Sequence, residues 1–130
     1  MLQRVYVDTS ALAALLLDQP HSEPLADWLD ETPAELVSSD LLETEMRRIA
    51  VREALPQGQV SELLAGVSLA TPDRAVYRGA GLLPIPHLRS LDAVHLESAI
   101  RLAADAVLTY DVRLAEAAQA VGLGVVTPGA

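Results

Sequence analysis

Short apolar segments alternate with helical patterns along the whole chain, and this alternation limits the folds that the sequence can adopt. The apolar segments have the length and β-branched content of buried strands, and they lie at residues 5–7, 35–38, 67–70, 106–109 and 124–127. Strands of this kind between helices are typical of a parallel sheet covered on both faces. The sequence therefore predicts an α/β protein, with residues 1–130 in one domain because no linker or repeat interrupts them.

The residues at the predicted helix starts follow the usual capping preferences. Helices are expected to begin after Asp8, at Ser22, at Ser39 or Asp40, near Val60, at Thr71 as cap with Pro72 in the first position, at Ser90 and at Asp111. The prolines of segment 81–90 predict a loop between two of these helices.

The apolar segments are too short to suggest a membrane protein. The longest run, residues 11–17, falls far below the length that crosses a bilayer, and the N-terminus lacks the pattern of a signal peptide. The chain also contains no cysteine, so it offers neither disulfides nor thiolate metal ligands. We therefore expect a cytoplasmic protein with no membrane partner.

Two aspartates stand at the predicted carboxyl ends of strands. Asp8 follows the strand at residues 5–7 and Asp111 follows the strand at residues 106–109, each just before a helix. In open parallel sheets, binding sites usually lie beyond the carboxyl ends of the strands, so both residues are candidates for a functional site. The alternative for each is a structural role as helix N-cap, which aspartate fills well.

A third carboxylate, Glu45, faces the predicted core side of its helix. With Leu41 placed at 0° and about 100° added for each residue, the apolar residues of segment 41–50 occupy one half of the helix. Glu45 falls at about 40°, within this half, whereas Glu43 falls at about 200°, outside it. The alternative for Glu45 is a salt bridge at the edge of the apolar face, with Arg48 or Arg52 as partner.

A fourth carboxylate, Asp92, occupies a similar position on the predicted helix at residues 91–104. It falls in the middle of the apolar half, which includes Leu91, whereas Glu97 and Arg101 fall on the opposite half. Its place in the first turn is the alternative explanation, because the helix dipole favours an anion there.

Buried carboxylates that share a site need a partner of opposite charge. Burying an unpaired carboxylate is costly, and neighbouring carboxylates raise one another's pKa. All nine basic residues are arginine, so no lysine is available to neutralise them. A divalent cation would do so directly, and carboxylate oxygens suit Mg²⁺ or Mn²⁺, whereas zinc usually prefers histidine or cysteine. The sequence therefore predicts an acidic metal site with Asp8 in its wall.

The histidines do not form a metal set. His21 and His87 neighbour prolines in predicted loops, and His95 lies on the inner side of its helix, three residues after Asp92. We expect His95 to be packed or hydrogen-bonded, without a direct catalytic role.

Four segments carry a resemblance to a known family. They are VYVDTSAL with Asp8, SSDLLETEMRRIA with Glu45, LRSLDAVHLESA with Asp92 and LTYDVRLAEAAQAVG with Asp111. In this order they resemble the four acidic blocks of PIN-domain ribonucleases, in particular the VapC-type toxins of bacterial toxin–antitoxin pairs. The likeness extends over residues 5–126, nearly the whole chain.

The resemblance implies an α/β/α sandwich with a central parallel sheet and RNA cleavage that depends on Mg²⁺ or Mn²⁺. The implied reaction is metal-assisted hydrolysis of a phosphodiester. The acidic cluster of the family falls on Asp8, Glu45, Asp92 and Asp111. Asp8 and Asp92 are the expected direct ligands, and Glu45 and Asp111 are expected to bind metal or to orient water. Asp111 corresponds to the most variable acid of the family.

The resemblance also implies supporting residues and partners. Thr9 or Ser10 matches a hydroxyl that helps to order water at the metal. Proteins of this kind are typically homodimers bound by a cognate antitoxin, whose tail wraps the toxin and can place a basic side chain in the acidic site.

The net charge of −9 argues against binding RNA over the whole surface. RNA would have to approach through local arginines near the acidic segments, which are Arg47, Arg48, Arg52, Arg89 and Arg113. We predict that they form a small positive rim around a negative site. The alternative for each is an ordinary solvated side chain. Because aromatic residues are scarce, an aromatic platform for base stacking is not expected.

Three alternative functions fit the sequence less well. A phosphatase usually needs a second aspartate two positions after the first, where this chain has Ser10. A receiver-type phosphoacceptor depends on lysine, which the chain lacks. The remaining alternative is a non-catalytic PIN-like module that binds a protein partner and uses its acids as helix caps. Such a module would show no Mn²⁺-dependent cleavage.

Overall fold

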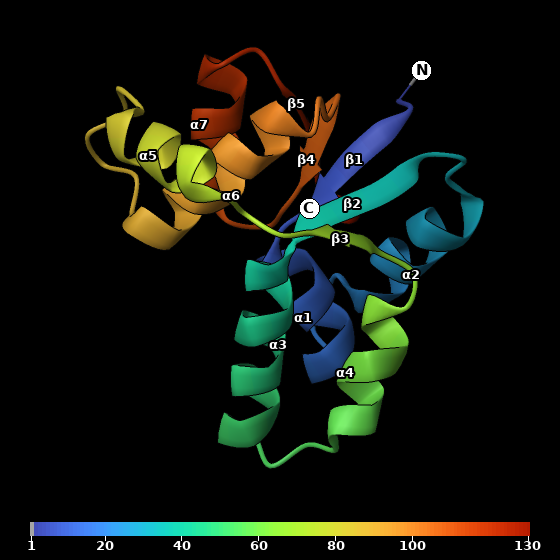
Figure 1. The fold of residues 1–130 in the computed structure, drawn as a ribbon. Helices are drawn as coiled ribbons and strands as arrows, with labels where there is room; N and C mark the ends of the chain where they lie inside the picture. Colours follow the sequence, from blue (N-terminus) through green and yellow to red (C-terminus); the bar gives the residue numbers. More distant parts are fainter. Residues whose placement is uncertain (1) are drawn as a thin grey trace.

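The computed structural model describes residues 2–130 and contains a five-stranded sheet (Figure 1). Its strands are β1 (Arg4–Val7), β2 (Glu35–Ser39), β3 (Ser68–Ala70), β4 (Ala106–Leu108) and β5 (Gly124–Val126). Every pairing is parallel, and the strand order is β3-β2-β1-β4-β5. The predicted strands and their parallel arrangement are confirmed.

Helices cover both faces of this sheet. They are α1 (Thr9–Leu17), α2 (Ser22–Glu31), α3 (Asp40–Arg52), α4 (Gln57–Leu64), α5 (Arg74–Leu82), α6 (Ser90–Arg101) and α7 (Val112–Ala120). Figure 1 shows α1 to α4 on one side and α5 to α7 on the other. In residues 2–130, no helix combines the length and the apolar composition needed to cross a bilayer.

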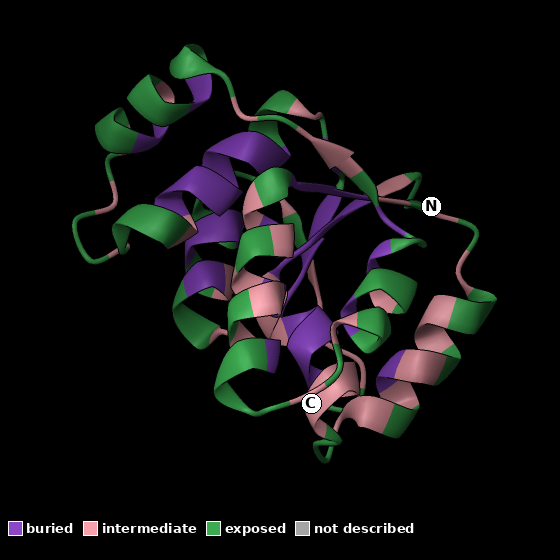
Figure 2. Cartoon of the chain, turned by 60° about the horizontal axis from the view of Figure 1, so that its bottom comes forward, coloured by how far each residue is buried: buried purple, intermediate pink, exposed green. Residues whose placement is uncertain are grey.

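The central strand β1 supplies side chains to two separate cores. Successive side chains of a strand point to opposite faces, so Val5 and Val7 pack against α1 and α3, whereas Tyr6 packs against α6 and α7. Figure 2 shows the buried strands enclosed between helices on both sides. Two apolar faces explain why the strands have no polar alternation, and the α/β/α sandwich is confirmed.

The direction of strand addition reverses at β1. From β1 the chain adds β2 and β3 on one side, then returns to add β4 and β5 on the other. Val7 pairs with Leu108, so the carboxyl ends of β1 and β4 lie side by side at this reversal. Asp8 and Asp111 follow these two ends closely in the chain. An open α/β sheet usually places its site at such a topological switch point.

The predicted start of α5 is wrong by two residues. Asp73 caps this helix, and its carboxylate accepts a hydrogen bond from the Val76 backbone N–H at 3.0 Å. Thr71, the expected cap, donates its hydroxyl to Asp40 at 2.7 Å instead. Pro72 therefore precedes the helix. The charged acceptor closer to the helix is the better cap, which explains the shift.

The predicted orientation of α6 is wrong for several side chains. Glu97, expected to point outward, is only 8% exposed and pairs with Arg101 at 2.6 Å. Leu91, expected inward, is 53% exposed. The reason is that α5 covers the side of α6 remote from the sheet, and Gly79 of α5 leaves space for the Glu97 carboxylate. Ser90, the expected cap, is the first helical residue, and Arg89 precedes it as N-cap without a capping side-chain hydrogen bond.

Candidate active site

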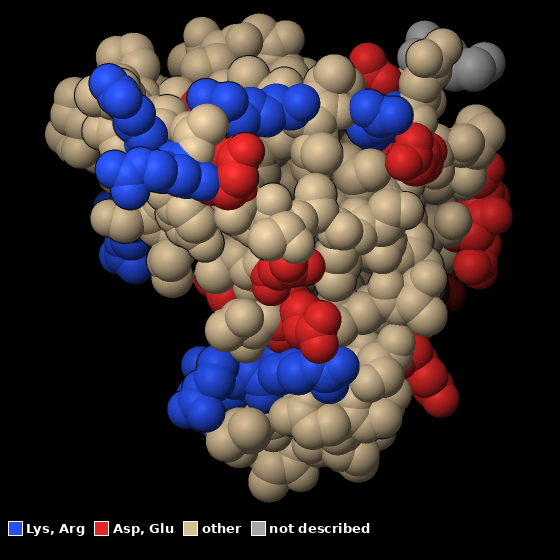
Figure 3. Space-filling model, in the orientation of Figure 1, with Lys and Arg blue, Asp and Glu red and all other residues tan. Residues whose placement is uncertain are grey.

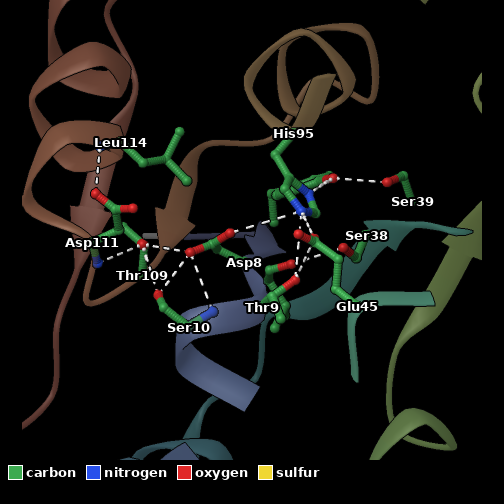
Figure 4. Close-up of polar contacts among 12 residues, drawn as sticks. Asp8, Thr9, Ser10, Ser38, Ser39, Glu45, His95, Thr109, Asp111 and Leu114 are labelled. Carbon is green, nitrogen blue, oxygen red and sulfur yellow. Dashed lines mark hydrogen bonds and ion pairs between the residues drawn. The ribbon is translucent and has the colours of Figure 1, made fainter. Parts of the chain in front are cut away.

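Asp8 is held firmly at the carboxyl end of β1 (Figure 4). Its side chain is buried, and Oδ2 accepts hydrogen bonds from the Ser10 hydroxyl at 2.7 Å, the Thr109 hydroxyl at 2.8 Å and the Ser10 backbone N–H at 3.3 Å. Asp8 therefore does cap α1. The other oxygen, Oδ1, accepts no hydrogen bond from residues 2–130 and lies 3.9 Å from Nε2 of His95. The capping role of Asp8 thus occupies Oδ2 and leaves Oδ1 without a hydrogen-bond donor in residues 2–130.

Glu45 projects from α3 toward the same place. Its Oε1 accepts a hydrogen bond from the Thr9 hydroxyl at 2.7 Å and lies 2.6 Å from Nε2 of His95. Burial by itself would raise the pKa of Glu45, but the hydrogen bond and attraction of His95, together with the Thr9 hydroxyl, lower it below its ordinary value. Because His95 is its partner, the alternative of a salt bridge to Arg48 or Arg52 is wrong.

Asp92 lies in the first turn of α6 among the other acids. Burial raises the pKa of its carboxyl, and the charges of Asp111 and Asp8 raise it further. Glu45 adds to this increase in pKa, whereas His95 opposes it. In position, Asp92 shares a cavity with Asp111, whereas Asp8 and Glu45 both lie beside His95. Within the described part of the chain, no hydrogen bond to the Asp92 carboxylate forms.

Asp111 caps α7, as the alternative reading of the sequence allowed. Its Oδ1 accepts hydrogen bonds from the backbone N–H groups of Arg113 at 2.9 Å and Leu114 at 3.2 Å. Asp111 also lines a cavity of about 250 Å³ together with Asp92, Arg89, Val112 and Arg113. Asp111 therefore caps a helix and also lies at the candidate site, as Asp8 does.

The donor chemistry of this cluster fits a hard divalent cation. Asp8, Glu45 and Asp111 each use one oxygen for internal hydrogen bonds and keep the second, and Asp92 keeps both. Such oxygens suit Mg²⁺ or Mn²⁺. In residues 2–130, no three histidine or acidic side chains lie close enough together to hold an ion. The site therefore fits a divalent cation in its charge and in the type of its donor atoms.

Several residues of the site were not identified from the sequence. His95 is 1% exposed and hydrogen-bonded, as expected, but its contact with Glu45 was not predicted. Thr109, which holds Asp8, was assigned only to a strand. Its position two residues before Asp111 is the one local signal that could have pointed to it. Of the two predicted hydroxyls, Ser10 contacts Asp8 and Thr9 contacts Glu45.

The five candidate arginines have different surroundings. Arg89 and Arg113 line the cavity that Asp92 and Asp111 share. In contrast, Arg47 donates to Glu43 at 2.8 Å and to Gln57 of α4 at 3.1 Å, and Arg52 pairs with Glu53. Figure 3 shows arginine side chains beside acidic ones over α3 and around α5. The positive rim stays a prediction, and the structure favours Arg89 and Arg113 as its members nearest the acids.

Fold and site together define a parallel α/β/α domain with an acidic cluster at its topological switch point. The family model of the PIN domain matches residues 5–120, so this chain belongs to the PIN domain family. It is similar to the Mycobacterium tuberculosis proteins Ribonuclease VapC35, with 41% identity over 96% of this chain and 97% of the relative, and Ribonuclease VapC47, with 34% identity over 97% and 98%.

Solved structures share the fold at low sequence identity. A crystal structure of Mycobacterium tuberculosis VapC20, described as a Sarcin-Ricin loop cleaving toxin, matches with a TM-score of 0.77 and 16% identity over 95% of this chain and 99% of that one. A toxin–antitoxin complex from Klebsiella pneumoniae matches with a TM-score of 0.74 and 18% identity over 95% and 97%. These likenesses confirm the fold that the resemblance implied.

Proposed function

We propose that this protein is a divalent-metal-dependent endoribonuclease that acts as the toxin of a toxin–antitoxin pair in the cytoplasm. The observation that carries the proposal is the placement of Asp8 and Glu45 beside His95, and of Asp92 and Asp111 along one cavity, near the switch point of the sheet. The similarity to ribonucleases of the VapC type over nearly the whole chain supports it. The metal would be Mg²⁺ or Mn²⁺, because the donors are carboxylate oxygens.

The four acids would divide the work according to how they are held. Asp8 and Asp92 would hold the cation, and Glu45 and Asp111 would complete its surroundings. A bound cation polarises the phosphate and lowers the pKa of an attacking water. The chain's own hydroxyls fix the geometry beforehand, since Ser10 and Thr109 hold Asp8 while Thr9 holds Glu45.

Metal removal tests the proposal directly. We expect the purified protein to cleave total RNA in the presence of Mn²⁺ or Mg²⁺, and cleavage to fall to background when EDTA removes the metal. Without a cation the clustered carboxylates repel the phosphates of RNA and nothing activates the water. The measurement is the rate of product formation on a denaturing gel, with restoration by added Mn²⁺. Cleavage that persists at full rate in EDTA would contradict the proposal.

Arginines beside the site are expected to bring RNA to it. Replacing Arg89 or Arg113 with glutamine should weaken RNA binding and reduce the salt dependence of log K by about 0.7 per lost phosphate contact. The variant Asp8→Asn, which we expect to be inactive, serves as background, so that RNA stays intact while binding is measured by fluorescence anisotropy at several salt concentrations. Arg52→Gln is the matched control, because Arg52 lies seven residues beyond Glu45, at the end of α3, and pairs with Glu53. If Arg52→Gln weakened RNA binding as much as Arg89→Gln and Arg113→Gln do, a local role of Arg89 and Arg113 would be contradicted.

The antitoxin and a second copy of this chain are the proposed protein partners. The Klebsiella pneumoniae structure of similar fold is a toxin–antitoxin complex, which supports an antitoxin as partner. The alternative of a non-catalytic module that binds a protein is less favoured, because the similar proteins VapC35 and VapC47 are named ribonucleases. A module of this kind would neither bind Mn²⁺ nor cleave RNA.

A further inference from the structure

A buried series of polar contacts leads to Glu45 through His95, on the side of Asp8 opposite Asp111 (Figure 4). The Tyr6 hydroxyl lies 3.1 Å from Oγ of Ser39 and 2.7 Å from Nδ1 of His95. The opposite ring nitrogen of His95, Nε2, lies 2.6 Å from Oε1 of Glu45. Tyr6, Ser39 and His95 are fully buried, so water does not compete for these contacts.

The direction of the hydrogen bond to Glu45 follows from its chemistry. An ionised carboxylate only accepts hydrogen bonds, so Nε2 of His95 must carry a proton and donate it to Oε1. On the other side of the ring, the oxygen of the Tyr6 hydroxyl contacts Nδ1, while the hydroxyl proton is donated to Oγ of Ser39. The imidazole is therefore held at both ends.

These contacts restrict a side chain that would otherwise be mobile. Fixing a glutamate side chain costs conformational entropy, which the groups that hold it must offset. His95 and Thr9 both bind Oε1 of Glu45, and this leaves Oε2 without a partner in residues 2–130. The His95 ring packs edge-on against Tyr6 with the ring centres 5.7 Å apart, so it cannot move away easily. The side chain of Glu45 is thus held in one orientation before any cation binds.

We infer that His95 is a positioning residue that holds Glu45 in the orientation required for cation binding, and that Tyr6 supports His95 in this task. The inference rests on the proposed function, because it assigns a role toward the same cation. It also gives a reason for the polar groups of Tyr6 and Ser39 in an otherwise apolar core. Hydrogen-bonding partners of metal ligands commonly change metal affinity or activity by about 10- to 100-fold.

Three variants test this inference, with Mn²⁺ affinity as the main measurement. We expect His95→Leu to weaken Mn²⁺ binding about 10- to 100-fold and to lower kcat without a matching change in KM for RNA. His95→Gln should recover much of the affinity, because its amide N–H can still donate to Glu45. Tyr6→Phe should weaken binding about 2- to 10-fold, as expected for one lost hydrogen bond. The controls are His87→Gln and Tyr77→Phe, two exposed side chains outside the site.

The free Mn²⁺ concentration can be followed by electron paramagnetic resonance, and thermal melting shows which variants fold. Should His95→Leu fail to fold, the comparison of His95→Gln and Tyr6→Phe with their controls still decides the question. Equal losses in His95→Leu and His95→Gln, or an unchanged Mn²⁺ affinity in the folded variants, would overturn the positioning role alone. If the unmodified protein neither bound Mn²⁺ nor cleaved RNA, the proposed function and this inference would both fall.

Discussion

The variant Asp8→Asn should lose metal-dependent RNA cleavage by about 10³-fold or more while it keeps the native fold. A metal ligand that carries charge contributes several kcal/mol to transition-state stabilisation, and about 1.4 kcal/mol corresponds to a tenfold change in rate. Asparagine keeps an oxygen for the hydrogen bonds that Ser10 and Thr109 donate, so the cap of α1 survives. Its NH₂ group then replaces Oδ1, which removes a charge and an acceptor from the site. The measurements are the cleavage rate with Mn²⁺ and the melting temperature.

The matched control for this change is Asp30→Asn, which alters an exposed aspartate of α2 and should leave cleavage unaffected. A melting temperature of Asp8→Asn close to that of the unmodified protein shows that lost activity is not lost folding. Undiminished cleavage by a folded Asp8→Asn protein would rule out Asp8 as a catalytic group.

Asp92→Asn should have opposite effects on activity and on stability. Cleavage should again fall by about 10³-fold, because a second charged ligand is lost. In EDTA, however, the variant should melt at a higher temperature than the unmodified protein at neutral pH. Burial and the charges of Asp111 and Asp8 raise the pKa of Asp92, so its ionised form is disfavoured in the folded state. The gain should stay below about 1 kcal/mol, because the carboxylate is partly exposed to solvent.

The pH dependence of stability tests whether the ionised Asp92 carboxylate destabilises the metal-free fold. A carboxyl whose pKa is raised on folding contributes stability below its unfolded-state pKa, and this contribution is lost as the pH rises through the folded-state pKa. The difference in melting temperature between Asp92→Asn and the unmodified protein should therefore grow with pH across the acidic range and then level off. A difference that shrinks with rising pH would show that the carboxylate stabilises the metal-free fold.

Added Mn²⁺ should reverse the order of stability. A cation at about 100 times its dissociation constant stabilises the folded protein that binds it by about 2.7 kcal/mol. The unmodified protein should gain this increment, and Asp92→Asn should lose most of it. Melting curves at several Mn²⁺ concentrations provide the measurement, with Asp30→Asn as the variant that responds normally. An equal Mn²⁺ response in the Asp92 variant would exclude Asp92 as a ligand.

Local patterns in the sequence determined the succession of strands and helices and singled out four acids as candidates for the site. Strands of β-branched residues without polar alternation are buried on both faces, which specifies a parallel sheet between two helical layers. Helical periodicity distinguished Glu45, which points to the site, from Glu43, which pairs with Arg47 on the outside. These features depend on neighbouring residues, so they are legible without coordinates.

Only the tertiary structure decided which groups meet. Thr109 reaches Asp8 across 101 positions of the chain, and Tyr6 reaches His95 across 89. The covering of α6 by α5 likewise buries Glu97, which a single helical period places outside. Periodicity reports one buried face of one helix, whereas a second layer and a shared hydrogen bond arise when distant segments pack together. For this reason the sequence could single out the candidate acids, but it could not show the contacts that orient Asp8 and Glu45.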